Sequence, residues 1–80
     1  MTGRRIADGS NVFEPGDYSK GFDGHWYART PNGLLAGLRN HSVREHEDGT
    51  ISVEPSILVH QPNVGQWHGY LQRGIWKECA

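Results

Sequence analysis

The sequence predicts an all-β fold: a small antiparallel sheet, sandwich or rolled barrel of six to seven short strands built from hairpins. Eleven glycines and four prolines interrupt the 80 residues, and the longest stretch free of both is 38–48. A helix of average length, about 11–12 residues, fits only there. The apolar residues of this stretch are Leu38 and Val43. It therefore lacks the apolar stripe by which a helix packs, and we expect a strand instead.

The first part of the chain is expected to be a flexible N-terminal arm over residues 1–21, followed by a single β domain over residues 22–80. The sizeable apolar side chains of the arm are Val12, Phe13 and Tyr18, and they are set among Gly, Asp, Ser and Pro. Such a composition buries little apolar surface. We expect Phe13 and Tyr18 to contact the domain and the first ten residues not to contact it.

Three hairpin loops share one pattern, in which the third turn residue is glycine: 31–33, 47–49 and 72–74. Glycine suits this position because it adopts a positive φ without steric cost. Two-residue loops would place Arg44 opposite Val53 and scatter the apolar residues over both faces, so three-residue loops are favoured. The resulting registers pair Thr30 with Leu34, Ala28 with Ala36, Trp26 with Leu38, Glu45 with Ile51, Val43 with Val53, Leu71 with Ile75 and Trp67 with Cys79.

A further strand is expected at residues 56–60. It contains three consecutive apolar residues, Ile57-Leu58-Val59, and such a run is typical of a strand buried on both faces. We therefore expect it at the centre of the sheet or covered by the N-terminal arm. Pro55 and Pro62 are expected to mark its ends, because proline cannot donate a hydrogen bond to a neighbouring strand.

Composition excludes several classes of protein. The net charge of −1 argues against a basic nucleic-acid-binding module, so nucleic acid is not an expected partner. A single cysteine excludes a disulfide framework and the multi-cysteine zinc ribbons. The longest apolar run, Leu34-Leu35-Ala36, is far shorter than the roughly 20 residues that span a bilayer. No apolar stretch follows the first arginines, so no secretory signal is expected, and we predict a cytosolic chain.

Five histidines and one cysteine raise the possibility of a zinc site. No zinc-finger spacing is present, so ligands would have to meet across strands. A two-residue turn at Arg73-Gly74 would place His68 opposite Cys79, whereas the favoured three-residue register places His68 opposite Glu78. We therefore expect surface histidines and no cofactor. The alternative is a zinc site in which two further histidines join His68 and Cys79.

No arrangement of residues predicts an enzyme, and we expect no catalytic residue. The acidic residues around the second hairpin are typical of a solvated turn, and no nucleophile accompanies them. Ser56 lies outside any GxSxG motif. Glycine-rich phosphate-binding patterns are also missing from the sequence.

The aromatic residues of the last hairpin are the best indication of a binding surface. In the favoured register, one face carries Trp67, Leu71, Ile75 and Cys79, and the other carries His68, Tyr70, Trp76 and Glu78. Aromatic residues on both faces indicate either a second small core or an exposed binding patch. Tryptophan and tyrosine are frequent anchors of protein interfaces. The predicted binding residues are Trp67, His68, Tyr70, Trp76 and Glu78.

Four segments of the sequence form a recognisable set: 26–33 (WYARTPNG), 46–59 (HEDGTISVEPSILV), 67–71 (WHGYL) and 74–79 (GIWKEC). Together they resemble a group of small uncharacterised proteins encoded by bacteriophages and prophages, and the resemblance covers residues 24–79. A larger phage-associated domain of unknown function is similar over the Pro-Ser-Ile-Leu-Val segment and the hairpin after it. That domain tends to have cysteine where this chain has Trp67, so a shared metal site is not implied.

The resemblance implies a phage context and no known activity. Small phage proteins made in the host cytoplasm tend to be accessory factors, and we expect a non-enzymatic protein that binds a host protein or protein complex. One form of this role is inhibition of a host defence such as CRISPR–Cas. The alternative is a zinc-stapled structural or minor virion protein. Exposed strand edges also predict a homodimer formed by edge pairing.

Overall fold

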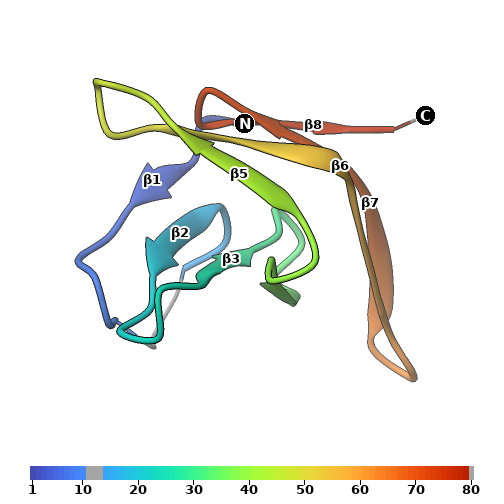
Figure 1. The fold of residues 1–80 in the computed structure, drawn as a ribbon. Helices are drawn as coiled ribbons and strands as arrows, with labels where there is room; N and C mark the ends of the chain where they lie inside the picture. Colours follow the sequence, from blue (N-terminus) through green and yellow to red (C-terminus); the bar gives the residue numbers. More distant parts are fainter. Residues whose placement is uncertain (11–13, 80) are drawn as a thin grey trace.

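The computed structural model describes residues 1–10 and 14–79, which form two four-stranded sheets (Figure 1). The first sheet contains β1 (Arg4–Arg5), β2 (Asp17–Lys20), β3 (Trp26–Arg29) and β4 (Leu35–Gly37), in that order. The second contains β5 (Ser42–Glu45), β6 (Ile51–Gln61), β7 (Gly65–Gln72) and β8 (Ile75–Glu78), in that order. The all-β prediction is confirmed, with eight strands in two open sheets. No described segment is a helix that could span a membrane.

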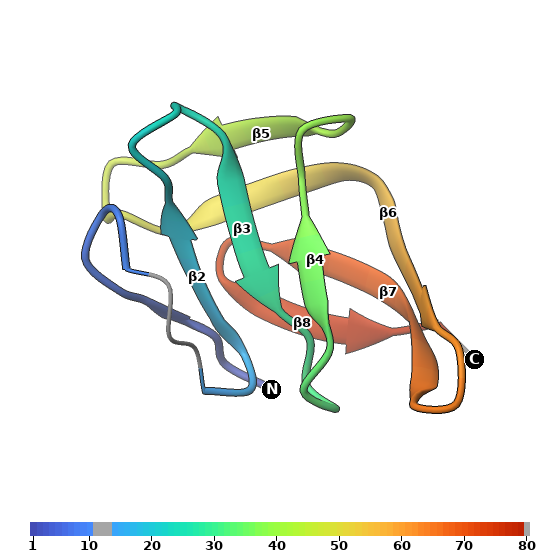
Figure 2. The ribbon, with the colours of Figure 1, turned by 90° about the horizontal axis from the view of Figure 1, so that it is seen from below.

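Neighbouring strands of each sheet follow one another in the sequence, because most are joined by tight turns. All pairs are antiparallel except β1 and β2, which are parallel and were not expected from the hairpin pattern. The strands of the first sheet cross those of the second steeply in Figure 2, so the sheets pack face to face as two layers.

The hydrophobic core lies between the two sheets. Burial alternates along β3 and β7, so that every second side chain points inward. The Trp67 and Trp76 rings meet edge to face, with 5.3 Å between centroids. The core residues are Tyr18, Trp26, Ala28, Leu34, Ala36 and Leu38 of the first sheet and its loops, and Ile51, Val53, Ile57, Trp67, Leu71 and Trp76 of the second sheet.

Two of the three predicted hairpin registers are confirmed. Ala28 pairs with Ala36 across β3 and β4, and Val43 pairs with Val53 across β5 and β6. Both hairpins have the expected three-residue loops. Their loop glycines, Gly33 and Gly49, both have a positive φ, which explains why glycine stands there.

The predicted register of the third hairpin is wrong. Leu71 pairs with Trp76 and not with Ile75, because the loop consists of Arg73 and Gly74 alone. Both residues have a positive φ, 46° and 75°, as a two-residue type I′ turn requires. Arginine is unusual at a positive φ, so the sequence favoured the longer loop. The shorter loop turns Trp76 inward onto Trp67.

The prediction for residues 56–60 is also wrong in part. Residues 56–60 do not lie at the centre of the sheet: β5 pairs with residues 51–54 of β6, and the later part of β6 pairs with β7 alone among the described strands. β6 also runs unbroken from Ile51 through Pro55 to Gln61. Its pairing with β7 shifts between Val53 and Ile57, and a proline is tolerated at such an irregularity. Beyond it the strand is buried on one face, since Ile57 is buried and Leu58 is 63% exposed. Figure 1 shows β6 and β7 bending here.

The start of the chain belongs to the β domain, which corrects the predicted arm over 1–21. β1 and β2 are strands of the first sheet, and Tyr18 is buried in the core as expected. The first ten residues also contact the domain: the Trp76 N–H donates to the Met1 carbonyl at 2.8 Å, and the Gly3 N–H donates to the Gly74 carbonyl at 2.7 Å. This segment therefore joins the edges of both sheets. The predicted contact of Phe13 lies outside the described residues.

Candidate functional site

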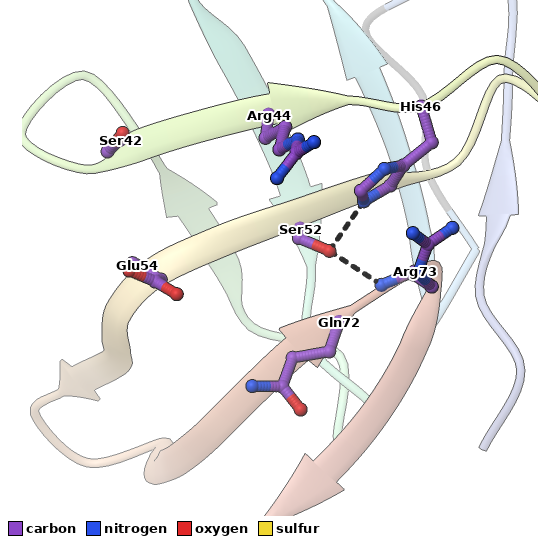
Figure 3. A pocket seen from close by; sticks show the side chains of 7 residues that line it. All are labelled: Ser42, Arg44, His46, Ser52, Glu54, Gln72 and Arg73. Carbon is purple, nitrogen blue, oxygen red and sulfur yellow. Dashed lines mark hydrogen bonds between the residues drawn. The ribbon is translucent and has the colours of Figure 1, made fainter.

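The outer face of the second sheet is hollowed beside the loops that join β5 to β6 and β7 to β8 (Figure 3). Residues that alternate with the core point outward here, so Arg44 and Ser52 flank Val43 and Val53 on the opposite face. The volume of the hollow is about 490 Å³. We call it the basic hollow; its lining residues are Ser42, Arg44, His46, Ser52, Glu54, Gln72 and Arg73.

Ser52 fixes the position of two neighbouring groups in the basic hollow. Its Oγ lies 2.7 Å from His46 Nε2 and accepts a hydrogen bond from the Arg73 backbone N–H at 2.9 Å. The Ser52 hydroxyl can donate to Nε2 or accept from it, according to the tautomer of the His46 ring. In the tautomer that accepts at Nε2, the proton of the His46 ring is on Nδ1. Ser52 thus ties the end of β5 to the β7–β8 turn.

The two arginines of the basic hollow keep their charged groups available. Figure 3 shows the Arg44 and Arg73 guanidinium groups on either side of the Ser52–His46 pair. Neither group takes part in an ion pair within residues 1–10 and 14–79, whereas Arg4 and Arg5 do. A guanidinium offers a planar set of N–H donors that fits carboxylate and phosphate oxygens. The basic hollow can therefore bind an anionic group.

Acidic residues surround the basic hollow. Glu54 is part of its lining, and an adjoining hollow of about 610 Å³ adds Glu47 and Asp48 from the β5–β6 loop. The pKa of Asp48 is lowered, mainly because its carboxylate accepts hydrogen bonds from the Thr50 hydroxyl and backbone N–H, and further by Coulombic interaction with the nearby His46 and Arg73 side chains. The cationic centre thus has an anionic rim.

The structure separates the five residues predicted to bind a partner. Trp67 and Trp76 are each only 3% exposed, so the expectation that Trp76 faces outward is wrong, and neither indole is part of the surface. The two-residue turn is the reason. His68 and Tyr70 are exposed, and Tyr70 is 41% exposed. Because they alternate with buried residues along β7, both side chains point to the outer face of the second sheet, which carries the basic hollow. Glu78 is exposed and pairs with Gly69. Binding by His68, Tyr70 and Glu78 stays a prediction.

The two candidate zinc ligands lie opposite each other across β7 and β8. The Cys79 N–H donates to the His68 carbonyl at 2.8 Å, which is the register of the two-residue turn. The His68 ring is hydrogen-bonded through Nε2 to the Ser56 hydroxyl at 2.9 Å. In the part of the chain that the structure describes, no three His, Cys, Asp or Glu side chains are grouped so that they could hold a metal ion. A zinc site therefore stays a prediction.

The outer face of the first sheet carries a hollow of different character. Its volume is about 420 Å³, and Phe22, Tyr27 and Leu35 contribute to its lining. Phe22 is 90% exposed. The Tyr27 hydroxyl donates to the Asp23 carboxylate at 2.6 Å, and this bond raises the pKa of Tyr27 and lowers that of Asp23. We call this site the aromatic hollow.

No pattern in the sequence predicted Arg44, His46, Ser52 or Arg73 as site residues. The predicted β5–β6 register, which is confirmed, already placed Arg44 and Ser52 opposite each other on the outer face. The contribution of Arg73 depends on the two-residue turn, which the glycine pattern did not indicate. The arginine and the serine on the outward face of the β5–β6 hairpin were therefore the signal in the sequence for half of the site.

Comparison of the chain with protein-family models, with curated proteins and with solved structures finds no match. The resemblance to phage-encoded proteins therefore stays a prediction.

Proposed function

We propose that this chain is a binding protein that contacts its partner through the outer face of the second sheet. One observation carries the proposal: the Arg44 and Arg73 guanidinium groups, which form no ion pair among the described residues, line a hollow on the face where Tyr70 is exposed. Arginine and tyrosine are both enriched at the centre of protein interfaces. The face thus offers charge and aromatic surface together.

A protein is a better fit to this face than a nucleic acid. The chain has a net charge of −1, and Glu47, Asp48 and Glu54 lie at or beside the basic hollow. These carboxylates would repel the regularly spaced charges of a phosphodiester backbone, which usually requires an excess of basic residues. We therefore propose a protein partner with a localised negative group.

The biological setting rests on the sequence resemblance alone. On that basis the partner is a host protein or protein complex, and the chain is a non-enzymatic phage accessory factor of the host cytoplasm. Inhibition of a host defence such as CRISPR–Cas is one form of this role. Homodimer formation through the outermost strands β4 and β5 is compatible with it, since no further strand pairs with their outer edges in the described sheets.

Site-specific photo-crosslinking tests the proposed face. A photoreactive phenylalanine analogue replaces Tyr70 in one variant and Phe22, on the opposite side of the molecule, in a second one. In host cytosol we expect a discrete crosslinked product from position 70 and none from position 22. Excess unlabelled protein should compete for that product. Crosslinking from position 22 alone, or from neither position, would contradict the proposal.

A second candidate function is a zinc-stapled structural or minor virion protein, as the sequence allowed. It is favoured by the direct pairing of His68 with Cys79 across β7 and β8, since both ligand types suit Zn²⁺. Metal analysis of protein purified without a histidine tag tests it. Less than about half an equivalent of zinc per chain would remove this candidate, because a structural site is normally filled.

A further inference from the structure

We infer that the basic hollow is a binding site for one phosphate monoester group, held by Arg44, His46 and Arg73. The inference deepens the proposed function and rests on it, because it names the group that the outer face of the second sheet recognises. The donors come from three places in the fold: the middle of β5, the residue just beyond β5, and the β7–β8 turn. Donors that approach from separate directions suit a tetrahedral anion.

The number and the charge of the donor side chains favour a ligand with several anionic oxygens. Two arginines oppose one glutamate in the lining, and the guanidinium groups form no ion pair within the described residues. A phosphate monoester carries about −1.5 to −2 charges at neutral pH and has three acceptor oxygens. One carboxylate has only two oxygens, so it can accept hydrogen bonds from fewer of the three side chains than a phosphate monoester can. The site therefore favours a phosphate monoester over a carboxylate.

Ser52 holds part of the site in place before a ligand binds. It is hydrogen-bonded to the His46 ring at 2.7 Å and to the Arg73 backbone N–H at 2.9 Å, as the dashed lines in Figure 3 show. In the tautomer described above, the Nδ1–H of His46 is a third donor. A donor set that is already oriented loses less conformational entropy on binding. Ser52 is thus a positioning residue for this site.

The anionic rim gives the site its selectivity. Glu54 lies in the lining, and Glu47 and Asp48 lie beside it. A compact group with one phosphorus atom fits between them, whereas a chain of phosphodiesters has to pass them and is repelled. We therefore expect a single phosphorylated side chain to bind more tightly than a single-stranded oligonucleotide.

Titration of the ¹⁵N-labelled chain by NMR at constant ionic strength tests the inference. The probes are a short peptide with one phosphoserine, the same peptide with serine, inorganic phosphate and a single-stranded oligonucleotide. We expect saturable shifts of the Ser52, Arg73 and Gly74 amides with the phosphopeptide, and none with the serine peptide. Amides of the aromatic hollow should not move. Inorganic phosphate that binds as tightly would support the site and identify free phosphate as the source.

Charge-removing variants give the matched comparison. Arg44→Gln and Arg73→Gln should each weaken phosphopeptide binding about tenfold, as expected for the loss of one charge-assisted hydrogen-bonded pair. Arg39→Gln makes the same change of net charge at an exposed residue outside the hollow, and it should leave the affinity unchanged. Preserved spectral dispersion would show that each variant is folded.

Three results would overturn the inference: no saturable shift in the parent chain, equal losses in all three variants, or tighter binding of the oligonucleotide than of the phosphopeptide. These results are independent of the crosslinking experiment, which needs no knowledge of the bound group. Phosphate binding without a crosslink from position 70 would leave the site standing and reject the partner-binding face. A crosslink from position 70 without phosphate binding would support the partner-binding face and reject the phosphate site.

Discussion

The outer faces of the two sheets differ in how their polar groups are satisfied. In the aromatic hollow of the first sheet, Tyr27 donates to Asp23 at 2.6 Å and Arg29 donates to the Gly33 carbonyl at 3.0 Å. In the basic hollow of the second sheet, the hydrogen bonds that hold the site involve His46, Ser52 and a backbone N–H. The guanidinium groups of that hollow form no ion pair among the described residues. The candidate binding face is therefore distinguished by two arginines that have no ion-pair partner in residues 1–10 and 14–79.

The inner faces differ as well, and they explain the high aromatic content of the chain. The second sheet supplies the Trp67–Trp76 pair to the core, whereas β3 and β4 of the first sheet supply Ala28 and Ala36 at directly paired positions. Two tryptophans that suggested a binding surface are thus packing residues. Tyr18 and Trp26 of the first sheet lie in the same core.

Removing an aromatic ring from the inside of the second sheet should have the largest effect. We expect Trp76→Ala to lower the free energy of unfolding by about 3–5 kcal/mol, because it leaves a cavity beside Trp67 and removes the hydrogen bond from the Trp76 indole to the Gly16 carbonyl. Phe22→Ala, on the outside of the first sheet, should change it by less than about 0.5 kcal/mol. Chemical denaturation followed by circular dichroism measures both. Similar losses would contradict the assigned burial.

A glycine in each sheet provides a second contrast. A Cβ at Gly69 in β7 would lie 2.2 Å from the Lys77 carbonyl oxygen and 2.5 Å from the Trp67 ring. Gly69→Ala should therefore cost about 1–3 kcal/mol or more through overpacking. A Cβ at Gly37 in β4 would meet nothing closer than 4.0 Å. Gly37→Ala should be neutral or stabilise by up to about 1 kcal/mol. The denaturation midpoints of the two variants test this contrast. Equal midpoints would mean that β7 and β8 do not approach each other so closely at Gly69.

Ser52→Ala should have a moderate effect that is confined to the basic hollow. Loss of its two hydrogen bonds should lower the free energy of unfolding by about 0.5–1.5 kcal/mol. It should also release the His46 ring, so that the ¹⁵N shifts of His46 move toward those of a mobile imidazole and phosphopeptide affinity falls severalfold. Ser10→Ala near the aromatic hollow is the control, because the bond there uses the Ser10 carbonyl and not its hydroxyl. An unchanged His46 signal would contradict the positioning role.

The sequence predicted those parts of the fold in which the local residue pattern is compatible with only one loop length and one register. Gly33 and Gly49 are the last residues of loops whose flanking strands alternate between apolar and polar side chains, so the registers of β3–β4 and β5–β6 could be derived. Gln72-Arg73-Gly74 is compatible with two loop lengths. The two-residue loop is the one that buries both Trp67 and Trp76. The stabilisation from this burial cannot be deduced from the local sequence pattern. The prediction that Leu58 is buried was wrong for a similar reason, because a run of apolar residues does not show that the strand bends and leaves one face exposed.

The candidate site could be predicted only in part. Alternation along β5 and β6 is enough to place Arg44 and Ser52 on a polar face. The side chain of Arg73 reaches the same hollow because of the two-residue turn, and the pairing of arginines with acids depends on contacts between distant segments. Arg5, for example, is bonded to Glu45, 40 residues away in the sequence.

That ion pair gives the smallest expected effect, and it depends on pH. Arg5 of the first sheet donates to the Glu45 carboxylate of the second sheet at 2.6 Å, and this hydrogen bond lowers the pKa of Glu45. A lowered pKa in the folded state stabilises the fold above the unfolded pKa, about 4.3. That stabilisation is lost as the pH falls from there through the folded pKa. Because the pair is exposed, the effect should be slight.

Glu45→Gln should therefore reduce the acid dependence of the denaturation midpoint below about pH 4.3, and the carboxyl ¹³C titration of Glu45 in the parent chain should show the lowered pKa directly. Glu47→Gln is the matched control, since Glu47 lies in the next loop and forms no ion pair within the described residues. If both variants responded to acid alike, the Arg5–Glu45 bond would not link the sheets in solution. The two layers would then be held together by their core and by the Met1 and Gly3 backbone hydrogen bonds to β8 and its turn.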